Sequence, residues 1–276
     1  MQSKDIVYMV PILDRTIVRR CLFMILLLDL SNLSLDIRVY QERKAVFSFR
    51  TYADKLRSEL EYQHILATFL EMEHLSIQDF DGAILSSVVP SLTNRIRNAT
   101  TMLLKKQCLV LNRTLKTGLA IRMDNPSEVG TDLIAEALGG VNDYQRDTLI
   151  VDMSTVVSFV VVTKRKEFVG GSLFPGLMTS SSLMFNSNAQ LMDIEFEKPK
   201  RMLGKSTKES MNNGILNGYA CLIEEFSRRI EIEHGSSLFK VLTGPDASLV
   251  RSLLTDMTYN PDIVFDGLYD IYMKNN

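Results

Sequence analysis

The feature that most constrains the fold of this chain is a pair of apolar segments that each run into an aspartate, a small turn and a second apolar segment. The first is MILLLDLSNLSLDI, which contains Asp29, and the second is TLIVDMSTVVSFV, which contains Asp152. Short apolar runs bounded by turn residues are typical of buried strands. The pattern therefore predicts two units, each made of a strand, an aspartate turn and a strand.

Aligning the two aspartates extends the match along the strands and turns that follow. The alignment places Ser31 on Ser154, Ile37 on Val160, Val39 on Val162, and the turn 41–44 on the turn 164–167. Two amphipathic hairpins can also look alike by chance. A duplication is the alternative that we follow, and it predicts two similar lobes whose aspartate turns face each other across a cleft.

The remaining hydrophobic periodicities predict a mixed α/β chain. Period-two and continuous apolar runs predict strands at 25–30, 34–40, 45–49, 82–89, 108–112, 149–153, 158–163, 168–171 and 240–244. Apolar residues at helical spacing predict helices at 54–75, 91–106, 206–235, 247–257 and 266–273. Ser91 is the expected N-cap of the second helix, and Ser206 with Glu209 has the spacing of a capping box.

The expected domain organisation is an N-terminal extension at 1–23, a first lobe at 24–140 and a second lobe at 141–276. The apolar run at 21–28 resembles the core of a secretion signal, but Asp29 interrupts it and no Ala-x-Ala cleavage site follows. It is also too short to cross a bilayer. We interpret it as a buried strand, with Met24 as a candidate start.

The charge balance and the positions of the cysteines indicate which kinds of binding partner to expect. The chain has 31 basic and 33 acidic residues, a balance that does not favour nucleic acid or an anionic membrane. Cys21, Cys108 and Cys221 share no short metal or redox spacing, and the histidines stand apart from them. We expect a reduced, cytoplasmic protein whose partners are small molecules or other protein chains, with no nucleic acid and no membrane.

A strand that ends in an acidic residue and turns tightly is suited to a nucleotide. The carboxylate can hold hydrated Mg²⁺, which prefers one or two carboxylates together with phosphate oxygens. Turn amides can point at phosphate oxygens, and glycine allows the closest approach. Both turns here carry serine, Ser31 and Ser154, where glycine would serve best.

Several motifs in order resemble the type III pantothenate kinases, members of the acetate and sugar kinase, Hsp70 and actin superfamily. DLSNL resembles the family's D-x-G-N-T turn, and DMSTV its D-x-G-T-A turn. The segments KTGLAIRMDNPSEVGTDLIAEAL, GGSLFPG and LGKSTKESMNNGI follow the family pattern at matching spacing. The resemblance runs from about Met24 to Met273. It implies duplicated actin-like ATPase lobes with a ribonuclease H-like fold and an interlobe nucleotide cleft.

The resemblance also implies roles for individual residues. Asp132 matches the general base that takes the proton from the primary hydroxyl of pantothenate. The phosphate and magnesium turn covers Asp29, Leu30, Ser31, Asn32, Leu33, Ser34, Leu35 and Asp36, and Thr155 is a nucleotide contact. The substrate segment comprises Met123, Gly130, Thr131, Asp132, Leu133 and Thr207. Asp152 matches the ligand of a monovalent cation, K⁺ or NH₄⁺, and Asp29 contacts Mg²⁺ through ATP. A homodimer is also implied.

The departures from the family pattern leave alternative functions open. Leu133 stands where the family has an arginine that can hold the substrate carboxylate, and Met123 replaces a tyrosine. Thr243 and Gly244 begin a T-G-G-like turn that Pro245 ends. The predicted function is ATP-dependent phosphorylation of pantothenate, the first step of coenzyme A biosynthesis. The alternatives are a catalytically impaired scaffold or regulator and a kinase for another small alcohol.

The candidate residues also have purely structural readings. Asp132 can be a carboxylate that favours the positive end of a helix dipole. Asp29 and Asp152 can simply end their strands, and Thr207 can be the first helical residue after the N-cap Ser206.

Overall fold

The computed structural model describes residues 24–186 and 194–276, and these residues form two compact units. Residues 24–118, Ser127–Gly139 and Val264–Asn276 belong to the first unit, and Leu119–Pro126 and Gly140–Ile263 to the second. The expected extension at 1–23, with Cys21, lies outside the described residues.

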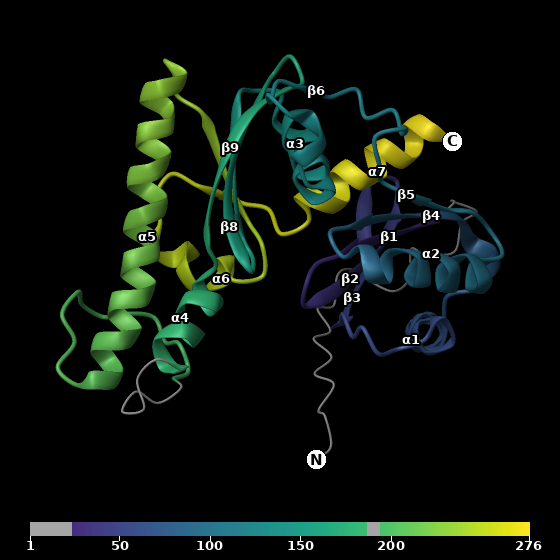
Figure 1. Cartoon of the computed structure of the whole chain (residues 1–276), viewed down its shortest axis with the longest axis horizontal. Helices are drawn as coiled ribbons and strands as arrows, with labels where there is room; N and C mark the ends of the chain where they lie inside the picture. The colour runs from purple at the N-terminus through teal and green to yellow at the C-terminus, as the bar shows by residue number, and fades with distance from the viewer. Residues whose placement is uncertain (1–23, 187–193) are drawn as a thin grey trace. The chain divides into compact units, whose positions relative to one another are not determined.

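The first unit is built on a sheet of five strands in the order β3-β2-β1-β4-β5 (Figure 1). Its strands are β1 (Met24–Leu30), β2 (Ser34–Gln41), β3 (Lys44–Tyr52), β4 (Phe80–Ser87) and β5 (Cys108–Val110). β1, β2 and β3 are an antiparallel meander, whereas β4 and β5 run parallel to β1. The β2–β3 turn has positive φ at Glu42 and Arg43, as a tight two-residue hairpin requires.

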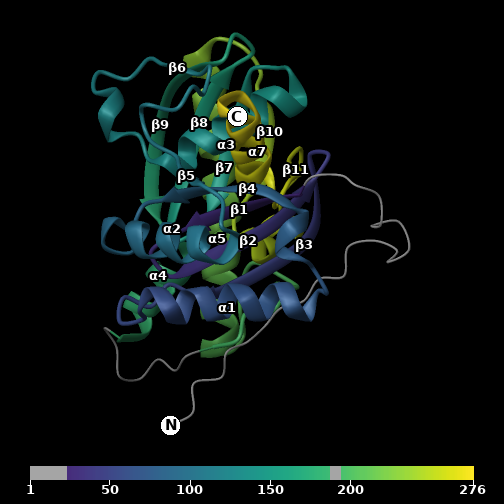
Figure 2. The ribbon, with the colours of Figure 1, turned by 90° about the vertical axis from the view of Figure 1, so that its right-hand side faces the viewer.

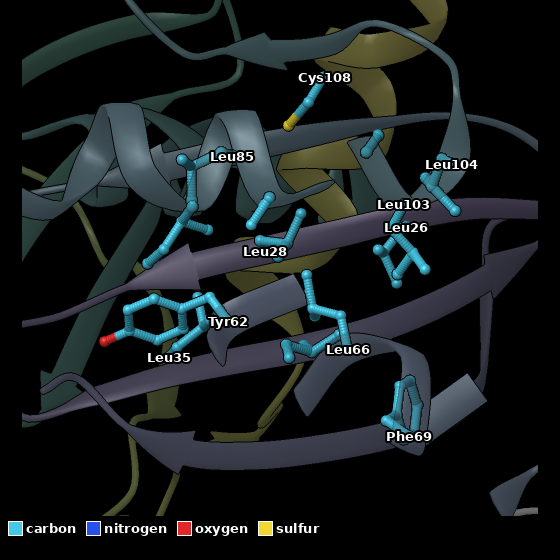
Figure 3. Packing of buried hydrophobic residues seen from close by; sticks show 14 of the residues in the cluster. Leu26, Leu28, Leu35, Tyr62, Leu66, Phe69, Leu85, Leu103, Leu104 and Cys108 are labelled. Atoms are coloured by element: carbon cyan, nitrogen blue, oxygen red, sulfur yellow. The ribbon is translucent and has the colours of Figure 1, made fainter. Parts of the chain in front are cut away.

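Two helices cover one face of this sheet, α1 (Glu59–Met72) and α2 (Pro90–Leu104) (Figure 2). Alternate β1 residues such as Leu26 and Leu28 point into the core, where they meet Leu66 of α1 and Leu103 of α2 (Figure 3). Cys108 is also buried there, and desolvation raises the pKa of its thiol to about 12. Ile25 and Leu27 on the opposite face of β1 are also buried, so this strand is covered on both faces and its sequence is continuously apolar up to Asp29.

The second unit has a sheet of six strands in the order β11-β10-β7-β8-β9-β6. Its strands are β6 (Ala120–Ile121), β7 (Thr148–Met153), β8 (Val156–Thr163), β9 (Glu167–Pro175), β10 (Phe239–Thr243) and β11 (Thr258–Tyr259). β7, β8 and β9 are again an antiparallel meander, and β10 and β11 continue parallel from β7. Apart from the added β6, the strand order repeats that of the first unit. The two sheets thus have the topology that the expected duplication predicts.

The helices complete each unit. α4 (Leu177–Asn186), α5 (Thr207–His234) and α6 (Ala247–Val250) belong to the second unit, with α5 alongside the sheet (Figure 1). Leu216 and Ile223 of α5 pack against Phe159 of β8. The remaining elements are α3 (Thr131–Tyr144), α7 (Ile263–Asn275) and the 3₁₀ turns η1 (Ile77–Asp79), η2 (Pro126–Glu128) and η3 (Arg251–Leu253).

The register corrects the alignment of the two halves by one residue. Asp29 pairs with Asp36, whereas Asp152 pairs with Ser158, so the second turn is one residue shorter than the first. Matched by pairing, Ile37 corresponds to Phe159 rather than Val160, and Val39 to Val161 rather than Val162. A one-residue shift moves each side chain to the other face of the sheet. The match of Asp29 with Asp152 is unaffected.

Several local expectations differ from the structure at helix ends. α1 begins after Ser58, whose hydroxyl and Glu61 form a complete capping box. α2 begins at Pro90, and its N-cap Val89 makes no side-chain cap, so Ser91 is not the cap. Ser206 accepts the N–H of Glu209, but the Glu209 carboxylate receives the N–H of Lys205 instead of closing the capping box. The helix expected at 247–257 is only α6 and the turn η3.

α7 packs with the first unit, although the expected second lobe at 141–276 includes it. The hydroxyl of Tyr40 donates a hydrogen bond to the carboxylate of Asp266 at 2.8 Å. The guanidinium of Arg43 donates two hydrogen bonds to the carboxylate of Asp270, each 2.9 Å long. A Cβ added at Gly267 would collide with the carbonyl of Ala135 in α3. These long-range contacts join the end of the chain to its beginning.

Within the described ranges, no helix is both long enough and apolar enough to cross a membrane.

Candidate functional site

A row of polar residues crosses the first sheet at the carboxyl end of β1. Asp29 lies opposite Asp36 on β2 and opposite Ser86 on β4. Asp36 in turn lies opposite Arg50 on β3. Residues directly opposite each other on neighbouring strands point to the same face of a sheet. The four side chains therefore share the face that α1 and α2 leave uncovered.

The turn that follows Asp29 is closed by its own serines. The N–H of Ser31 donates to the carbonyl of Ser34 at 2.9 Å, and the N–H of Ser34 donates to the hydroxyl of Ser31 at 3.1 Å. The carbonyl of Leu33 also accepts the N–H of Ala53 at 3.0 Å, which ties the turn to the end of β3. Asn32 and Leu33 are exposed at its tip. Leu30 and Leu35 are fully buried and anchor the turn in the core.

The start of α3 is attached to the end of β4 beside this row. The hydroxyl of Thr131 lies 3.2 Å from the hydroxyl of Ser86, and it receives the N–H of Ser87 at 3.2 Å. Since Ser86 is the ladder neighbour of Asp29, Thr131 places the first turn of α3 next to the aspartate turn. Asp132 follows in that first turn. Asp29 and the adjacent pair Thr131 and Asp132, which lie far from Asp29 in the sequence, thus come together in one unit.

The carboxyl of Asp132 is held in a partly desolvated position. It accepts the N–H of Leu133 at 2.9 Å. Burial raises the pKa of Asp132, and this exceeds the opposite effect of hydrogen bonds from the N–H groups of Leu133 and of Asp132 itself. A Cβ on Gly130 would collide with Oδ1 of Asp132. A side chain at position 130 would therefore make this carboxyl move.

An equivalent row crosses the second sheet. Asp152 lies opposite Ser158 on β8 and opposite Thr243 on β10, and all three side chains are buried. Among the residues that the structure describes, the hydroxyl of Ser158 has no hydrogen-bond partner. Gly244 follows with φ +93°, and a Cβ there would collide with Oδ1 of Asp152. Asp152 and the Thr243–Gly244 turn are thus neighbours.

The turn after Asp152 contacts the start of α4. The carbonyl of Thr155 accepts the N–H of Gly176 at 3.1 Å and the hydroxyl of Thr179 at 3.0 Å. A Cβ on Gly176 would collide with the carbonyls of Ser154 and Thr155. The glycine of the FPG motif is therefore needed where the backbone of this second aspartate turn is closely packed.

The remaining candidate residues lie elsewhere in the fold. Met123 follows β6 and is 36% exposed, and Thr207 is the first residue of α5. Both belong to the second unit, whereas Gly130, Thr131, Asp132 and Leu133 belong to the first.

Sequence reasoning missed Ser86, Ser87, Arg50 and Ser158. The sequence offered a signal only for Ser86 and Ser87, which stand at the end of the apolar strand GAILSS. Arg50 and Ser158 become neighbours of the aspartates only through strand pairing.

Two sheets of the same strand order, each with an aspartate at the carboxyl end of its first strand, give the chain the fold of actin-like ATPases and sugar kinases. Solved structures agree in fold. Component A of (R)-2-hydroxyglutaryl-CoA dehydratase from Acidaminococcus fermentans has a TM-score of 0.53 at 12% identity, covering 91% of this chain and 97% of that one. A protein from Sinorhizobium meliloti, proposed to be a 2-dehydro-3-deoxygalactonokinase, has a TM-score of 0.57 at 11% identity, covering 90% and 95%.

The sequence identifies the family within this class. Residues 25–229 match the family model of type III pantothenate kinase. A type III pantothenate kinase from Bacillus cytotoxicus is 34% identical over 254 residues, which cover 91% of this chain and 97% of the relative. The chain belongs to the type III pantothenate kinase family, whose members are phosphotransferases with an alcohol acceptor.

Proposed function

We propose that this chain phosphorylates pantothenate to 4'-phosphopantothenate with ATP, the first step of coenzyme A biosynthesis. Membership of the family supports the reaction. The observation that carries the residue assignment is the attachment of Thr131 to Ser86 and Ser87, because it brings Asp132 beside the turn that starts at Asp29.

In the proposed reaction, Asp132 is the general base. Its carboxylate takes the proton of the primary hydroxyl, the hydroxyl oxygen forms a bond to the γ-phosphorus, and the bond from that phosphorus to the bridging oxygen of ADP breaks. Phosphoryl transfer depends mainly on alignment and charge stabilisation. A base with a raised pKa is better matched to proton transfer than an ordinary aspartate.

We propose that the turn 29–36 receives the phosphates. Asn32 and Leu33 are exposed at its tip, and their N–H groups donate to no protein group among the described residues. Backbone N–H groups of this kind bind phosphate oxygens. Asp29 and Asp36 lie opposite each other on neighbouring strands, and carboxylates are the ligands that Mg²⁺ prefers. Asp29 is the residue proposed to contact the Mg²⁺ that ATP carries.

The second aspartate turn fits a monovalent cation. Asp152, Ser158 and Thr243 bring a carboxylate and two hydroxyls to one face, and the buried hydroxyl of Ser158 has no partner in residues 24–186 and 194–276. Oxygen ligands of this kind suit a hard cation such as K⁺. We propose Asp152 as its ligand and Thr155 as a nucleotide contact.

The remaining assignments are Met123, Gly130, Thr131, Leu133 and Thr207 as the pantothenate segment. A homodimer and a cytoplasmic location stay predictions of the family resemblance.

The test is a direct assay. Purified protein with ATP, Mg²⁺, K⁺ or NH₄⁺ and pantothenate should yield phosphopantothenate, and Asp132→Asn should lower kcat by about 10²- to 10⁴-fold. Asp256→Asn is the matched control, because Asp256 is an exposed carboxylate paired with Lys240 at 3.1 Å. A protein that forms no product at any pantothenate concentration would instead support the scaffold alternative.

A second outcome has a specific structural basis. Leu133 supplies no charge for the substrate carboxylate, although it occupies the position after the base. Product formed only from an alcohol without a carboxylate would favour a kinase for another small alcohol. If pantothenate is phosphorylated with a high KM, Leu133→Arg should lower that KM.

A further inference from the structure

We propose that Arg50 binds the phosphate groups of the nucleotide, held in place for this by Asp36 and Ser34. The inference rests on the proposed function, because it assumes that the turn 29–36 receives a nucleotide. It adds a cationic residue of β3 that the motif resemblance does not assign.

The position of Arg50 comes from strand pairing. Arg50 lies opposite Asp36, and Asp36 lies opposite Asp29, so the three side chains share one row and one face of the sheet. That face also carries Ser86, to which the first turn of α3 is attached. A guanidinium in this row therefore lies within the candidate site.

The way in which Arg50 contacts Asp36 leaves most of its guanidinium available. Nε of Arg50 donates to Oδ1 of Asp36 at 2.5 Å, while the hydroxyl of Ser34 donates to Oδ2 at 2.8 Å. Arg50 and Ser34 thus contact different oxygens of the Asp36 carboxylate, and the contact of Arg50 is single-pronged. The Nη groups of Arg50 donate to no protein atom among the described residues.

Other arginines of the chain show the contrasting arrangement. Arg43 contacts Asp270 through both Nε and Nη2 at 2.9 Å. Arg228 contacts Glu225 through both Nε and Nη2 at 2.8 Å. The contact of Arg50 with Asp36 is single-pronged by comparison, and it leaves the N–H donors of both Nη groups available.

Charge identifies the ligand. Asp29, Asp36 and Asp132 bring three carboxylates to this region, and the guanidinium of Arg50 contacts the buried carboxylate of Asp36. A polyphosphate beside three carboxylates needs cationic compensation, and arginine matches phosphate geometry through paired N–H donors. The Arg50 side chain is 42% exposed, so it can reach a bound ligand.

The rival role for Arg50 is to neutralise the buried carboxylate of Asp36, because an unpaired buried charge destabilises a fold. A double-mutant cycle separates the two roles. Binding of Mg²⁺ with a non-hydrolysable ATP analogue would be measured by calorimetry for the wild type, Arg50→Gln, Asp36→Asn and the double variant.

If Arg50 contacts phosphate, Arg50→Gln should weaken analogue binding by roughly 10- to 100-fold, and a loss of similar size should persist in the Asp36→Asn background. If the loss disappears in that background, Arg50 only neutralises Asp36 and the proposal is overturned. Arg228→Gln is the matched control, because it removes a surface arginine that is also paired with a carboxylate. It should bind the analogue as the wild type does.

Pantothenate turnover distinguishes failure of this inference from failure of the proposed function. A wild type that binds the analogue in an Arg50-dependent manner but forms no phosphopantothenate would contradict the proposed function and support the phosphate contact. An active wild type whose Arg50→Gln variant keeps the same analogue affinity and the same kcat/KM for ATP would contradict the phosphate contact alone.

Discussion

At the scale of single residues, the absence of a side chain at Gly130 leaves room for the carboxyl of Asp132, the proposed base. A Cβ at this position would collide with Oδ1 of Asp132, so Gly130→Ala should displace the carboxyl from its productive position. We expect kcat to fall on the order of 10- to 100-fold, with little change in nucleotide affinity. Gly218→Ala is the control, because a Cβ there meets nothing within 4 Å and kcat should be unchanged. A Gly130→Ala enzyme with wild-type kcat would contradict the positioning role.

The raised pKa of Asp132 predicts how activity depends on pH. As the proposed base, Asp132 acts in its ionised form, so the acid limb of the profile of kcat/KM should lie above the ordinary aspartate value of 3.8. Activity should rise as pH increases through the raised pKa. Any residual activity of Asp132→Asn should lack this limb. A limb centred at or below the ordinary value would show that another group limits the rate.

The raised pKa of Asp132 also predicts how the stability of the fold depends on pH. A carboxyl whose pKa is raised by folding binds its proton more tightly in the folded state than in the unfolded state. The free energy of unfolding therefore falls as pH rises from the unfolded pKa through the folded pKa. Asp132→Asn removes this penalty and keeps an acceptor for the N–H of Leu133. The variant should melt above the wild type at neutral pH, and the gap should close below about pH 3.8 in calorimetric scans.

At the scale of elements, we expect substitutions of the serines near the starts of α1 and α2 to have different effects on stability. Ser58 accepts the N–H of Glu61 and closes a capping box, so Ser58→Ala should lower the free energy of unfolding by about 0.5–2 kcal/mol. Ser91 lies inside α2 without a capping role, so Ser91→Ala should change stability by no more than a few tenths of a kcal/mol. Chemical denaturation measures both, and equal losses would contradict the assigned helix starts.

Elements were predicted well where the signal was local. The nine expected strands all occur, because apolar alternation and turn residues act within a few positions. Helix ends were predicted less well. The start of α2 follows from the proline at its first position rather than from Ser91, and the half-closed capping box at Ser206 reflects competition by Lys205 for the Glu209 carboxylate.

At the scale of the whole molecule, each unit has its own hydrophobic core. Leu66 is fully buried in the core of the first unit and Ile223 in that of the second. Truncation of either to alanine should cost about 2–5 kcal/mol. Hydrogen exchange should then lose protection mainly in the sheet of the unit that carries the change. Equal loss in both sheets after either substitution would show that the cores do not unfold as separate units.

The sequence alone determined the aspartate turns, the strand meanders and the duplication, because period-two hydrophobicity and turn chemistry depend on near neighbours. It also carried the family motifs that point to Asp132. Tertiary structure decided the register of the repeat, the place of α7 in the first unit and the polar rows that bring Arg50 to Asp36 and Thr131 to Ser86. These features depend on contacts between residues that are distant in the sequence. Ser86 and Thr131, for example, are 45 positions apart, and only the packed chain brings them into contact.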